Sequence, residues 1–191
     1  MIFDQFDPLA DQPVRTPALA GAGRDARTPA VTDAGRQLTS AGAILTAETA
    51  VQVKRLGLPL PAALGFFSGF ADLALRGDAG HIYSVSGFLG FRPQSGQVLA
   101  PYVGKTDPKD PVLSPMYADL TGFPPTLCMT GTRDICLGGT VDFHRALLRA
   151  GVDARLMVFD AMPHAHWYSF QLPESQEALA AQARFLDRHL T

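Results

Sequence analysis

Three short apolar segments constrain the fold of this chain more than any other feature of its sequence. They lie at 63–69 (ALGFFSG), 124–131 (PPTLCMTG) and 153–159 (DARLMVF), and none of them alternates strictly between apolar and polar residues. Strands that are apolar on both faces are typical of parallel sheets, whose two faces are covered by helices. Helical patterns separate and follow these segments. We therefore predict an α/β domain with a parallel sheet.

Three segments with helical patterns accompany the apolar strands. They lie at 41–55, 138–150 and 173–190. The first begins directly after Ser40, and serine is a common capping residue at the start of a helix. The first two end close to a glycine, as helices commonly do. The predicted order is helix, strand, loops, strand, helix, strand, helix, in which the stretch 70–111 forms loops with at most one short helix.

The first 38 residues differ in composition from the rest of the chain. Residues 8–37 are mostly Ala, Gly, Arg, Asp, Thr and Pro, with almost no large apolar side chain and no helical or strand period. Such a segment buries too little apolar surface to offset the entropy of ordering it. We therefore expect residues 1–38 to be an irregular leader and residues 39–191 to fold. The stretch GAGRDA at 21–26 fits a loose dinucleotide-binding pattern, but no strand precedes it, so we predict no nucleotide cofactor.

Charge, hydropathy and cysteine content exclude several classes of function. The net charge is −2 and no segment is strongly basic, which argues against nucleic acid or an anionic membrane as the main partner. No apolar run approaches the roughly 18 residues that span a bilayer, and no secretion signal is visible. The two cysteines, Cys128 and Cys136, match no zinc spacing. We expect a cytoplasmic protein with reduced thiols and no metal site.

Polar residues follow the predicted strands at positions where parallel α/β sheets carry their chemistry. Asp134 comes just after the second apolar strand, His164 just after the third, and Ser40 opens the first helix. If a strand also leads into Ser40, the three side chains share one edge of the sheet. A serine that attacks a carbonyl needs an imidazole to take its proton and a carboxylate to orient that imidazole. The pattern indicates a serine hydrolase; the competing interpretation of Ser40 is a simple helix cap.

Three motifs support a resemblance to a known family. They are TSAGA at 39–43, DPVLSPMYADLTGFPPTLCMTGTRD at 110–134 and FDAMPHAHWY at 159–168. From about Thr39 to its end, the chain resembles the hormone-sensitive-lipase-like branch of the α/β hydrolases, a group of bacterial carboxylesterases. The order Ser, Asp, His along the chain is also the order in that fold. The resemblance implies a partial α/β-hydrolase fold: the C-terminal part of the parallel sheet, here three strands, with flanking helices.

The resemblance also implies hydrolysis of a small-molecule carboxylic ester without a cofactor. Ser40 would be the nucleophile, His164 the general base and Asp134 the residue that orients the base. The backbone N–H of Ala41, the first after the nucleophile, would donate to the oxyanion. The family pattern places its histidine directly after Met-Pro, which favours His164 over His166, and His166 would then be a wall of the pocket.

Two departures from the family pattern lead to a competing hypothesis. Leu38 stands where the family has the first glycine of G-x-S-A-G, and the sequence contains no H-G-G motif, which in the family donates oxyanion N–H groups. Losing one such donor lowers a rate by about 10²–10³-fold. The alternative is a catalytically inactive α/β-hydrolase fragment, truncated at its N-terminus, with at most a ligand-binding role. A third hypothesis is an unrelated α/β binding domain in which Asp134 and His164 lie far apart.

A sheet of three parallel strands would also expose an apolar edge. Unpaired strand edges bind readily to strands of other chains. We therefore predict a homodimer, or aggregation, through this edge.

Overall fold

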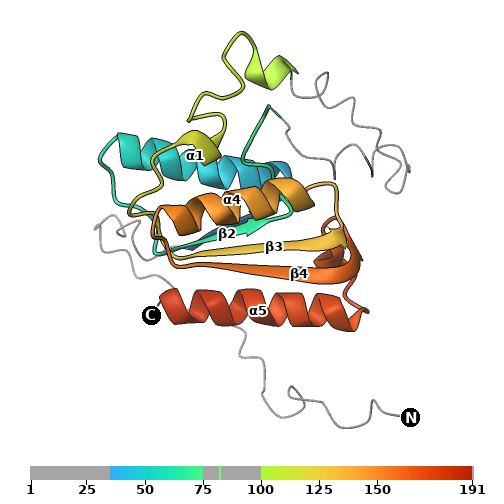
Figure 1. Cartoon of the computed structure of the whole chain (residues 1–191). Helices are drawn as coiled ribbons and strands as arrows, with labels where there is room; N and C mark the ends of the chain where they lie inside the picture. Colours follow the sequence, from blue (N-terminus) through green and yellow to red (C-terminus); the bar gives the residue numbers. More distant parts are fainter. Residues whose placement is uncertain (1–34, 75–81, 83–99, 191) are drawn as a thin grey trace, which may run out of the picture.

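The computed structural model describes residues 35–74, 82 and 100–190 (Figure 1). Residues 1–34 of the predicted leader lie outside the described residues. In chain order, the elements are β1 (Gly35–Thr39), α1 (Ala41–Arg55), β2 (Ala63–Phe67), the 3-10 helix η2 (Pro115–Tyr117), β3 (Thr126–Arg133), α4 (Leu137–Arg149), β4 (Ala154–Pro163), the 3-10 helix η3 (His166–Tyr168) and α5 (Pro173–His189).

The described strands form one parallel sheet in the order β1-β2-β3-β4, which confirms the predicted α/β class. The sheet has four strands rather than the expected three, because β1 lies partly in the segment predicted to be irregular. β1 pairs with β2 from Gly35↔Ala63 to Thr39↔Phe67. The sequence GRQLT has no apolar run, but its backbone N–H and C=O groups form a ladder as those of any residue do. The prediction of an irregular leader is therefore wrong for residues 35–38.

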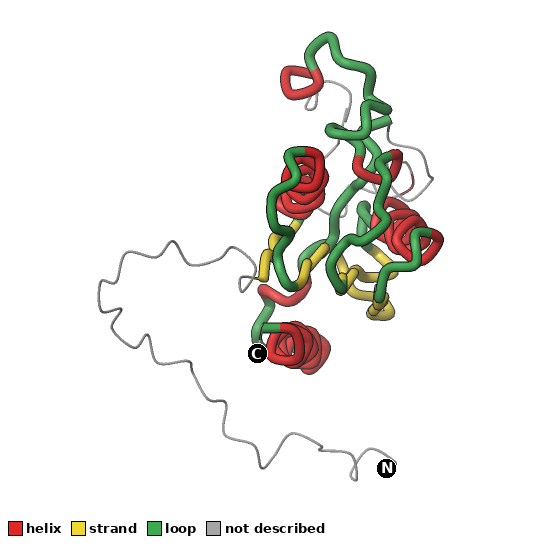
Figure 2. The backbone as a smooth tube through the Cα atoms, turned by 90° about the vertical axis from the view of Figure 1, so that its left-hand side faces the viewer, coloured by secondary structure: helices red, strands yellow, loops and turns green. Residues whose placement is uncertain are grey.

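Helices cover both faces of the sheet (Figures 1 and 2). α1 and α4 lie on one face and α5 lies on the other. On the first face, Phe66 packs in a cluster with Phe143 of α4, and their ring centroids are 4.6 Å apart. On the second face, Phe67 packs with Trp167 and with Phe185 of α5. Adjacent residues of β2 thus fill two different apolar clusters, as the alternation of side chains along a strand requires.

α1 packs closely on the sheet because small residues line its inner face. Ala43, Ala47 and Ala50 are almost completely buried and follow the spacing of one helical face. The helix occupies the range predicted from the sequence, and Gly57 follows it in a left-handed conformation with φ 65°. The other predicted helices and strands are also present, with ends that differ by a few residues.

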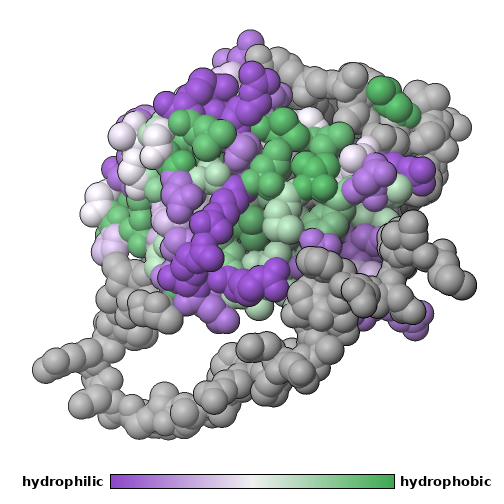
Figure 3. All heavy atoms as spheres, turned by 60° about the horizontal axis from the view of Figure 1, so that its bottom comes forward, coloured by the Kyte–Doolittle hydropathy of each residue, from purple (hydrophilic) through white to green (hydrophobic). Residues whose placement is uncertain are grey.

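None of the helices in the described part of the chain combines the length and apolar character needed to cross a bilayer. Figure 3 turns the side that carries α5 towards the viewer, and hydrophilic and hydrophobic residues both reach the surface there. The functional candidates lie elsewhere, at the edge of the sheet where the four strands end.

Candidate active site

All four strands end at one edge of the sheet, and a polar residue follows each of them. Ser40 follows β1, Ser68 follows β2, Asp134 follows β3 and His164 follows β4. Because the strands are parallel, their carboxyl ends lie side by side at this edge. The hydroxyl of Tyr168 lies 3.5 Å from Oγ1 of Thr39, so the segment after His164 reaches across to the residue before Ser40.

Ser40 occupies a strained turn between β1 and α1. Its backbone has φ 60° and ψ −125°, a conformation that side-chain-bearing residues rarely adopt. Its N–H donates to the carbonyl of Phe67 at 3.0 Å, which ties the turn to the end of β2. The side chain makes no capping hydrogen bond to α1, so the interpretation of Ser40 as a simple helix cap is wrong. The turn places Ser40, which is half-buried, directly before the helix, the position that the nucleophile has in a nucleophile elbow.

The strained turn forms although Leu38 stands in place of the family's glycine. Leu38 lies within β1 and pairs with Phe66 of β2 in the parallel ladder. The backbone on both sides of Leu38 therefore follows the strand–turn–helix path that places Ser40 at the edge.

Asp134 is completely buried and accepts four hydrogen bonds. Oδ1 accepts from the backbone N–H of Cys136 and faces Nδ1 of His164, both at 2.8 Å. Oδ2 accepts from Oγ1 of Thr130 at 2.8 Å and from Oγ of Ser68. Both oxygens are therefore saturated, which holds the carboxylate in one orientation. Asp134 and His164 lie together, so the hypothesis of an unrelated domain in which they are far apart is wrong.

The hydrogen bonds also keep Asp134 ionised. Burial raises the pKa of its carboxyl. The hydrogen bond and charge of His164, together with the hydrogen bonds from Ser68 and Cys136, lower this pKa by more than burial raises it. The net pKa of Asp134 therefore lies below its usual value. An ionised carboxylate can only accept, so Nδ1 of His164 carries the proton of the bond between them. Nε2 of His164 is then the nitrogen left free to act as a base.

His166, the second histidine of this segment, lies in the protein core. It is 2% exposed, and its ring packs against Phe159 and Trp167 with centroids 4.8 and 5.0 Å away. The carbonyl of Pro163 is near its ring, but neither ring nitrogen makes a hydrogen bond of good geometry with the described residues. Burial lowers the pKa of His166. The expectation that His166 forms a wall of the pocket is therefore wrong.

A bulge near the end of β4 directs His164 towards Asp134. The register between β3 and β4 shifts between Gly131 and Arg133, and Ala161 takes φ 57° at this point. The N–H of Ala161 donates to Oγ1 of Thr132 at 2.7 Å. A Cβ on Gly131 would lie only 2.1 Å from the carbonyl oxygen of Met162, so the close crossing of the two strands requires glycine.

The backbone N–H of Ala41 lies at the start of α1, next to Ser40. Ala41 is exposed, and its N–H donates to none of the described residues. The partial positive charge at a helix N-terminus favours a negatively charged group at this position.

Ser40 Oγ forms no hydrogen bond with His164 among the described residues, and catalytic hydrogen bonds are often longer before a substrate binds.

The ligand atoms of Asp134, Cys136 and His164 lie within 4.8 Å of one another, a spacing at which side chains can hold a metal ion. Both oxygens of Asp134 already accept hydrogen bonds, however, and burial raises the pKa of the Cys136 thiol well above its usual value. The group therefore fits a hydrogen-bonded network better than a metal site.

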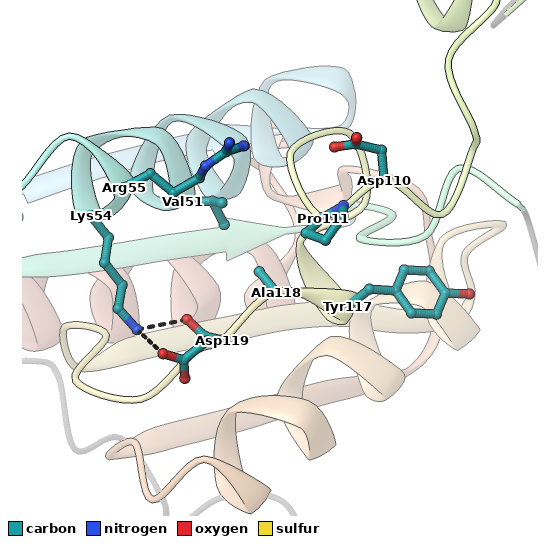
Figure 4. A pocket seen from close by; sticks show the side chains of 8 residues that line it. All are labelled: Val51, Lys54, Arg55, Asp110, Pro111, Tyr117, Ala118 and Asp119. Atoms are coloured by element: carbon teal, nitrogen blue, oxygen red, sulfur yellow. Dashed lines mark hydrogen bonds and ion pairs between the residues drawn. The ribbon is translucent and has the colours of Figure 1, made fainter.

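A cavity of about 440 Å³ lies between the last turns of α1 and residues 110–119 (Figure 4). The lysine at its rim, Lys54, uses its ammonium group within the protein: it bonds the carboxylate of Asp119 at 2.9 Å, the carbonyl of Asp119 at 2.7 Å and that of Thr121 at 2.6 Å. Ser40 and Lys54 lie at opposite ends of α1, about 20 Å apart at 1.5 Å per residue. The end of the cavity that Lys54 lines is therefore far from Ser40.

The parallel sheet, the strained serine turn and the Asp–His pair after later strands define the class of protein as an α/β hydrolase. Residues 38–168 match the family described as the alpha/beta hydrolase fold, and the chain belongs to that family. This finding confirms the predicted fold and the family resemblance.

Similar proteins are esterases and related hydrolases. An acetyl-hydrolase of Streptomyces hygroscopicus is 32% identical over 148 residues, which cover 77% of this chain and 50% of that protein. A solved esterase of the bacterial hormone-sensitive lipase family is 32% identical, with a TM-score of 0.74 and coverage of 82% of this chain and 52% of that one. A hormone-sensitive lipase from a metagenome library is 28% identical, with a TM-score of 0.77, and the same share of this chain covers 53% of it. The chain thus spans about half the length of the relatives it matches.

Two residues of the site, Ser68 and Thr130, were not predicted from the sequence. A single serine after an apolar strand and a threonine within another carry no distinctive pattern. The one indication available was their position: Ser68 and Thr130 lie opposite each other once β2 and β3 are paired in register.

Proposed function

We propose that the chain hydrolyses carboxylic esters, with Ser40 as nucleophile, His164 as general base and Asp134 as the residue that orients the base. The observation that carries the proposal is the 2.8 Å contact of His164 Nδ1 with Asp134 Oδ1, at the edge where Ser40 occupies a strained turn. The family membership of the chain supports the same assignment. Names of relatives such as acetyl-hydrolase favour a small-molecule ester with a short acyl group as substrate.

The proposed reaction proceeds in two proton-coupled halves. Oγ of Ser40 attacks the ester carbonyl while Nε2 of His164 accepts the hydroxyl proton, and the N–H of Ala41 donates to the oxyanion that forms. His164 then returns the proton to the leaving alcohol, which leaves an acyl group on Ser40. Water repeats the sequence: His164 takes a proton from it, the hydroxide attacks the acyl group, and Ser40 regains its proton. Asp134 stays ionised throughout and stabilises the imidazolium. No cofactor takes part.

Reaction of the purified chain with a fluorophosphonate probe, followed by mass spectrometry of the labelled peptide, tests this proposal. We expect labelling at Ser40, complete loss in Ser40→Ala and slow labelling in His164→Ala, since the base activates the nucleophile. Ser169→Ala is a matched control, because Ser169 is an exposed serine near the same edge with no proposed role. Release of p-nitrophenol from p-nitrophenyl acetate gives a second readout.

An unlabelled but folded wild-type chain would contradict the proposal. That result would support the alternative, an inactive α/β-hydrolase fragment with at most a ligand-binding role. The cytoplasmic location expected from the sequence stays a prediction.

We also propose that the chain associates through the outer edge of β1. Within the described residues, β1 pairs only with β2, so its other edge offers free N–H and C=O groups. Light scattering should detect a homodimer or larger assemblies, and a strictly monomeric sample with one cooperative melting transition would contradict this expectation.

A further inference from the structure

The carboxylate of Asp134 is held from the side opposite to His164 by two buried hydroxyls. Ser68 and Thr130 are both 0% exposed, and both donate to Oδ2 of Asp134. The oxygen that faces His164 is the other one, Oδ1. Each hydroxyl must act as the donor, because an ionised carboxylate has no proton to give. The two hydroxyls therefore prevent the carboxylate from turning about its bond to Cβ.

The two hydroxyls come from neighbouring strands that are locked in register. Phe67 pairs with Met129, so the next residue of each strand, Ser68 and Thr130, lie side by side. The N–H of Ser68 donates to the carbonyl of Met129 at 2.8 Å, which continues the ladder one residue beyond β2. The position of both hydroxyls is thus set by backbone pairing and not by flexible loops.

The same register connects the hydroxyls to Ser40. Thr39 pairs with Phe67, and the N–H of Ser40 donates to the carbonyl of Phe67 at 3.0 Å. Ser40, Ser68 and Thr130 consequently form a row across three adjacent strands. Ser68 has φ 49°, a left-handed conformation that side chains other than glycine's rarely adopt. Two strained serines therefore stand next to each other in this row, one at the proposed nucleophile and one at the acid.

We propose that Ser68 and Thr130 are positioning residues of the hydrolase, which fix Asp134 so that it imposes one tautomer on His164. Because Oδ2 is occupied, Oδ1 stays aligned with Nδ1–H, and Nε2, the nitrogen proposed to act as the base, stays unprotonated. The inference rests on the roles proposed above for Ser40, His164 and Asp134. The inference adds that Asp134 keeps His164 in the required tautomer only while the hydroxyls of Ser68 and Thr130 hold its carboxylate.

The chain offers a closely matched pair of variants. Thr130→Val removes the hydroxyl that bonds Asp134, whereas Thr126→Val removes a hydroxyl at the start of the same strand that donates to the carbonyl of Pro124 at 2.9 Å. Both threonines are 0% exposed, so the loss of packing and of one buried hydrogen bond is comparable. Thr130→Ser restores a hydroxyl and serves as the rescue.

Two variants at position 68 separate the hydroxyl from the backbone strain. Ser68→Ala removes the hydroxyl and keeps the strained residue, whereas Ser68→Gly removes the hydroxyl and relieves the strain at φ 49°. If the hydroxyl is what matters, the two variants should show the same defect although their melting temperatures differ.

The first readout is the tautomer of His164, measured from the two ring-nitrogen shifts of ¹⁵N-histidine-labelled protein and assigned with His164→Ala. In the wild type, the proton should be on Nδ1. We expect both tautomers in Thr130→Val, Ser68→Ala and Ser68→Gly, and only the wild-type form in Thr126→Val and Thr130→Ser. A purely structural role of the hydroxyls would lower the melting temperature without moving this equilibrium.

The second readout is the rate of fluorophosphonate labelling at Ser40. We expect a decrease of about 10–100-fold in the three variants without the hydroxyl, since small displacements of catalytic groups have effects of this size. Wild-type tautomer and labelling rate in folded Thr130→Val and Ser68→Gly would overturn the inference. The variants could also change the tautomer of His164 in a chain whose Ser40 never reacts with the probe. That result would keep the inference about Ser68 and Thr130 and refute the proposed function. Should the valine variant fail to melt cooperatively, Thr130→Ala replaces it and is judged by the same two readouts.

Discussion

The chain turns at both ends of the parallel strands, but different residue types take the positive φ values at the two edges of the sheet. Both edges need turns with positive φ. At the edge where strands begin, these turns use glycines with φ between 65° and 75°, namely Gly57, Gly122 and Gly151. At the edge where strands end, the residues with positive φ, between 49° and 60°, carry side chains: Ser40, Ser68 and Ala165, together with Ala161 in the bulge of β4. Strained conformations thus gather where the candidate active site lies, as they commonly do at functional sites.

The charged pairs at the two edges differ in their exposure to solvent. Lys54 and Asp119 form an ion pair whose side chains are 28% and 73% exposed. Asp134, which is 0% exposed, faces His164 in a network that saturates both of its oxygens. Exposed pairs contribute little to stability, whereas a buried carboxylate depends on every partner it has. The first edge therefore tolerates change, and the second does not.

The largest expected difference between the edges concerns the two aspartates. Asp134→Asn should lower the rate of ester hydrolysis about 10⁴-fold, because an amide no longer imposes the correct tautomer on the histidine. Asp119→Asn, at the other edge, should leave this rate unchanged. The measurement is kcat and KM with p-nitrophenyl acetate for both variants.

The hydrogen bond from Lys54 is the main cause that lowers the pKa of Asp119 to about 2. The carboxylate is mostly exposed to solvent, which screens its charge, so we expect no influence of this pair on the distant site. Equal rates of the two variants would contradict the comparison, since the buried aspartate would then have no special role.

The next effect concerns glycines with and without space for a side chain. Gly131→Ala should lower activity at least 10²-fold and reduce stability by about 3 kcal/mol, because the new Cβ would meet the carbonyl of Met162 at 2.1 Å and displace the bulge that carries His164. Gly138→Ala in α4 is the matched control: nothing lies within 4 Å of its Cβ, and alanine favours the helix.

Urea unfolding and the same ester assay measure both glycine variants. A Gly131→Ala chain with wild-type stability and rate would show that the crossing of β3 and β4 adapts easily, and that the bulge does not position the histidine.

The smallest effect concerns the pH dependence of stability. Burial lowers the pKa of His166 from its ordinary value of 6.5, while the charges of Asp134 and Glu174 act in the opposite direction. The unfolded chain therefore binds more protons than the folded one below about pH 6.5, and stability should fall as the pH decreases from 7 towards 5. His166→Phe should reduce this decline, because the phenyl ring stays neutral among Phe159 and Trp167.

Melting temperatures between pH 5 and 7 test the histidine prediction. Burial raises the pKa of Glu48, which works with the opposite sign, so the difference between variant and wild type isolates His166. His144→Gln is the control at the other edge, where the ring of His144 bonds the carbonyl of Ala154 at 3.3 Å. Identical pH profiles of the wild type and His166→Phe would contradict the assignment.

Most of the fold was predictable because its signals are local. The apolar runs of β2, β3 and β4 and the helical periods of α1, α4 and α5 are properties of consecutive residues. β1 was missed because GRQLT has no strand pattern of its own and becomes a strand only beside β2. The stretches 75–81 and 83–99 within the predicted loops lie outside the described residues.

The candidate site was predictable in part. Motifs and strand ends pointed to Ser40, Asp134 and His164, and the structure brings Asp134 and His164 into contact. Aromatic residues near these strand ends differ in exposure: Phe66, Phe67 and Trp167 are buried in the core, whereas Tyr168 is 63% exposed. Ser68 and Thr130 had no signal in the sequence, because a hydroxyl becomes a ligand of a carboxylate only through contacts between distant segments.

The sequence by itself therefore determined the class of fold, the order of most elements and the edge of the sheet at which chemistry is expected. Hydrophobic periodicity and the loops after strands are properties of consecutive residues and can be recognised without the structure. Only the tertiary structure decided which residues take strained backbone conformations and how the carboxylate is held. These features depend on the register between strands and on a bulge, and register is an agreement between segments far apart in the sequence.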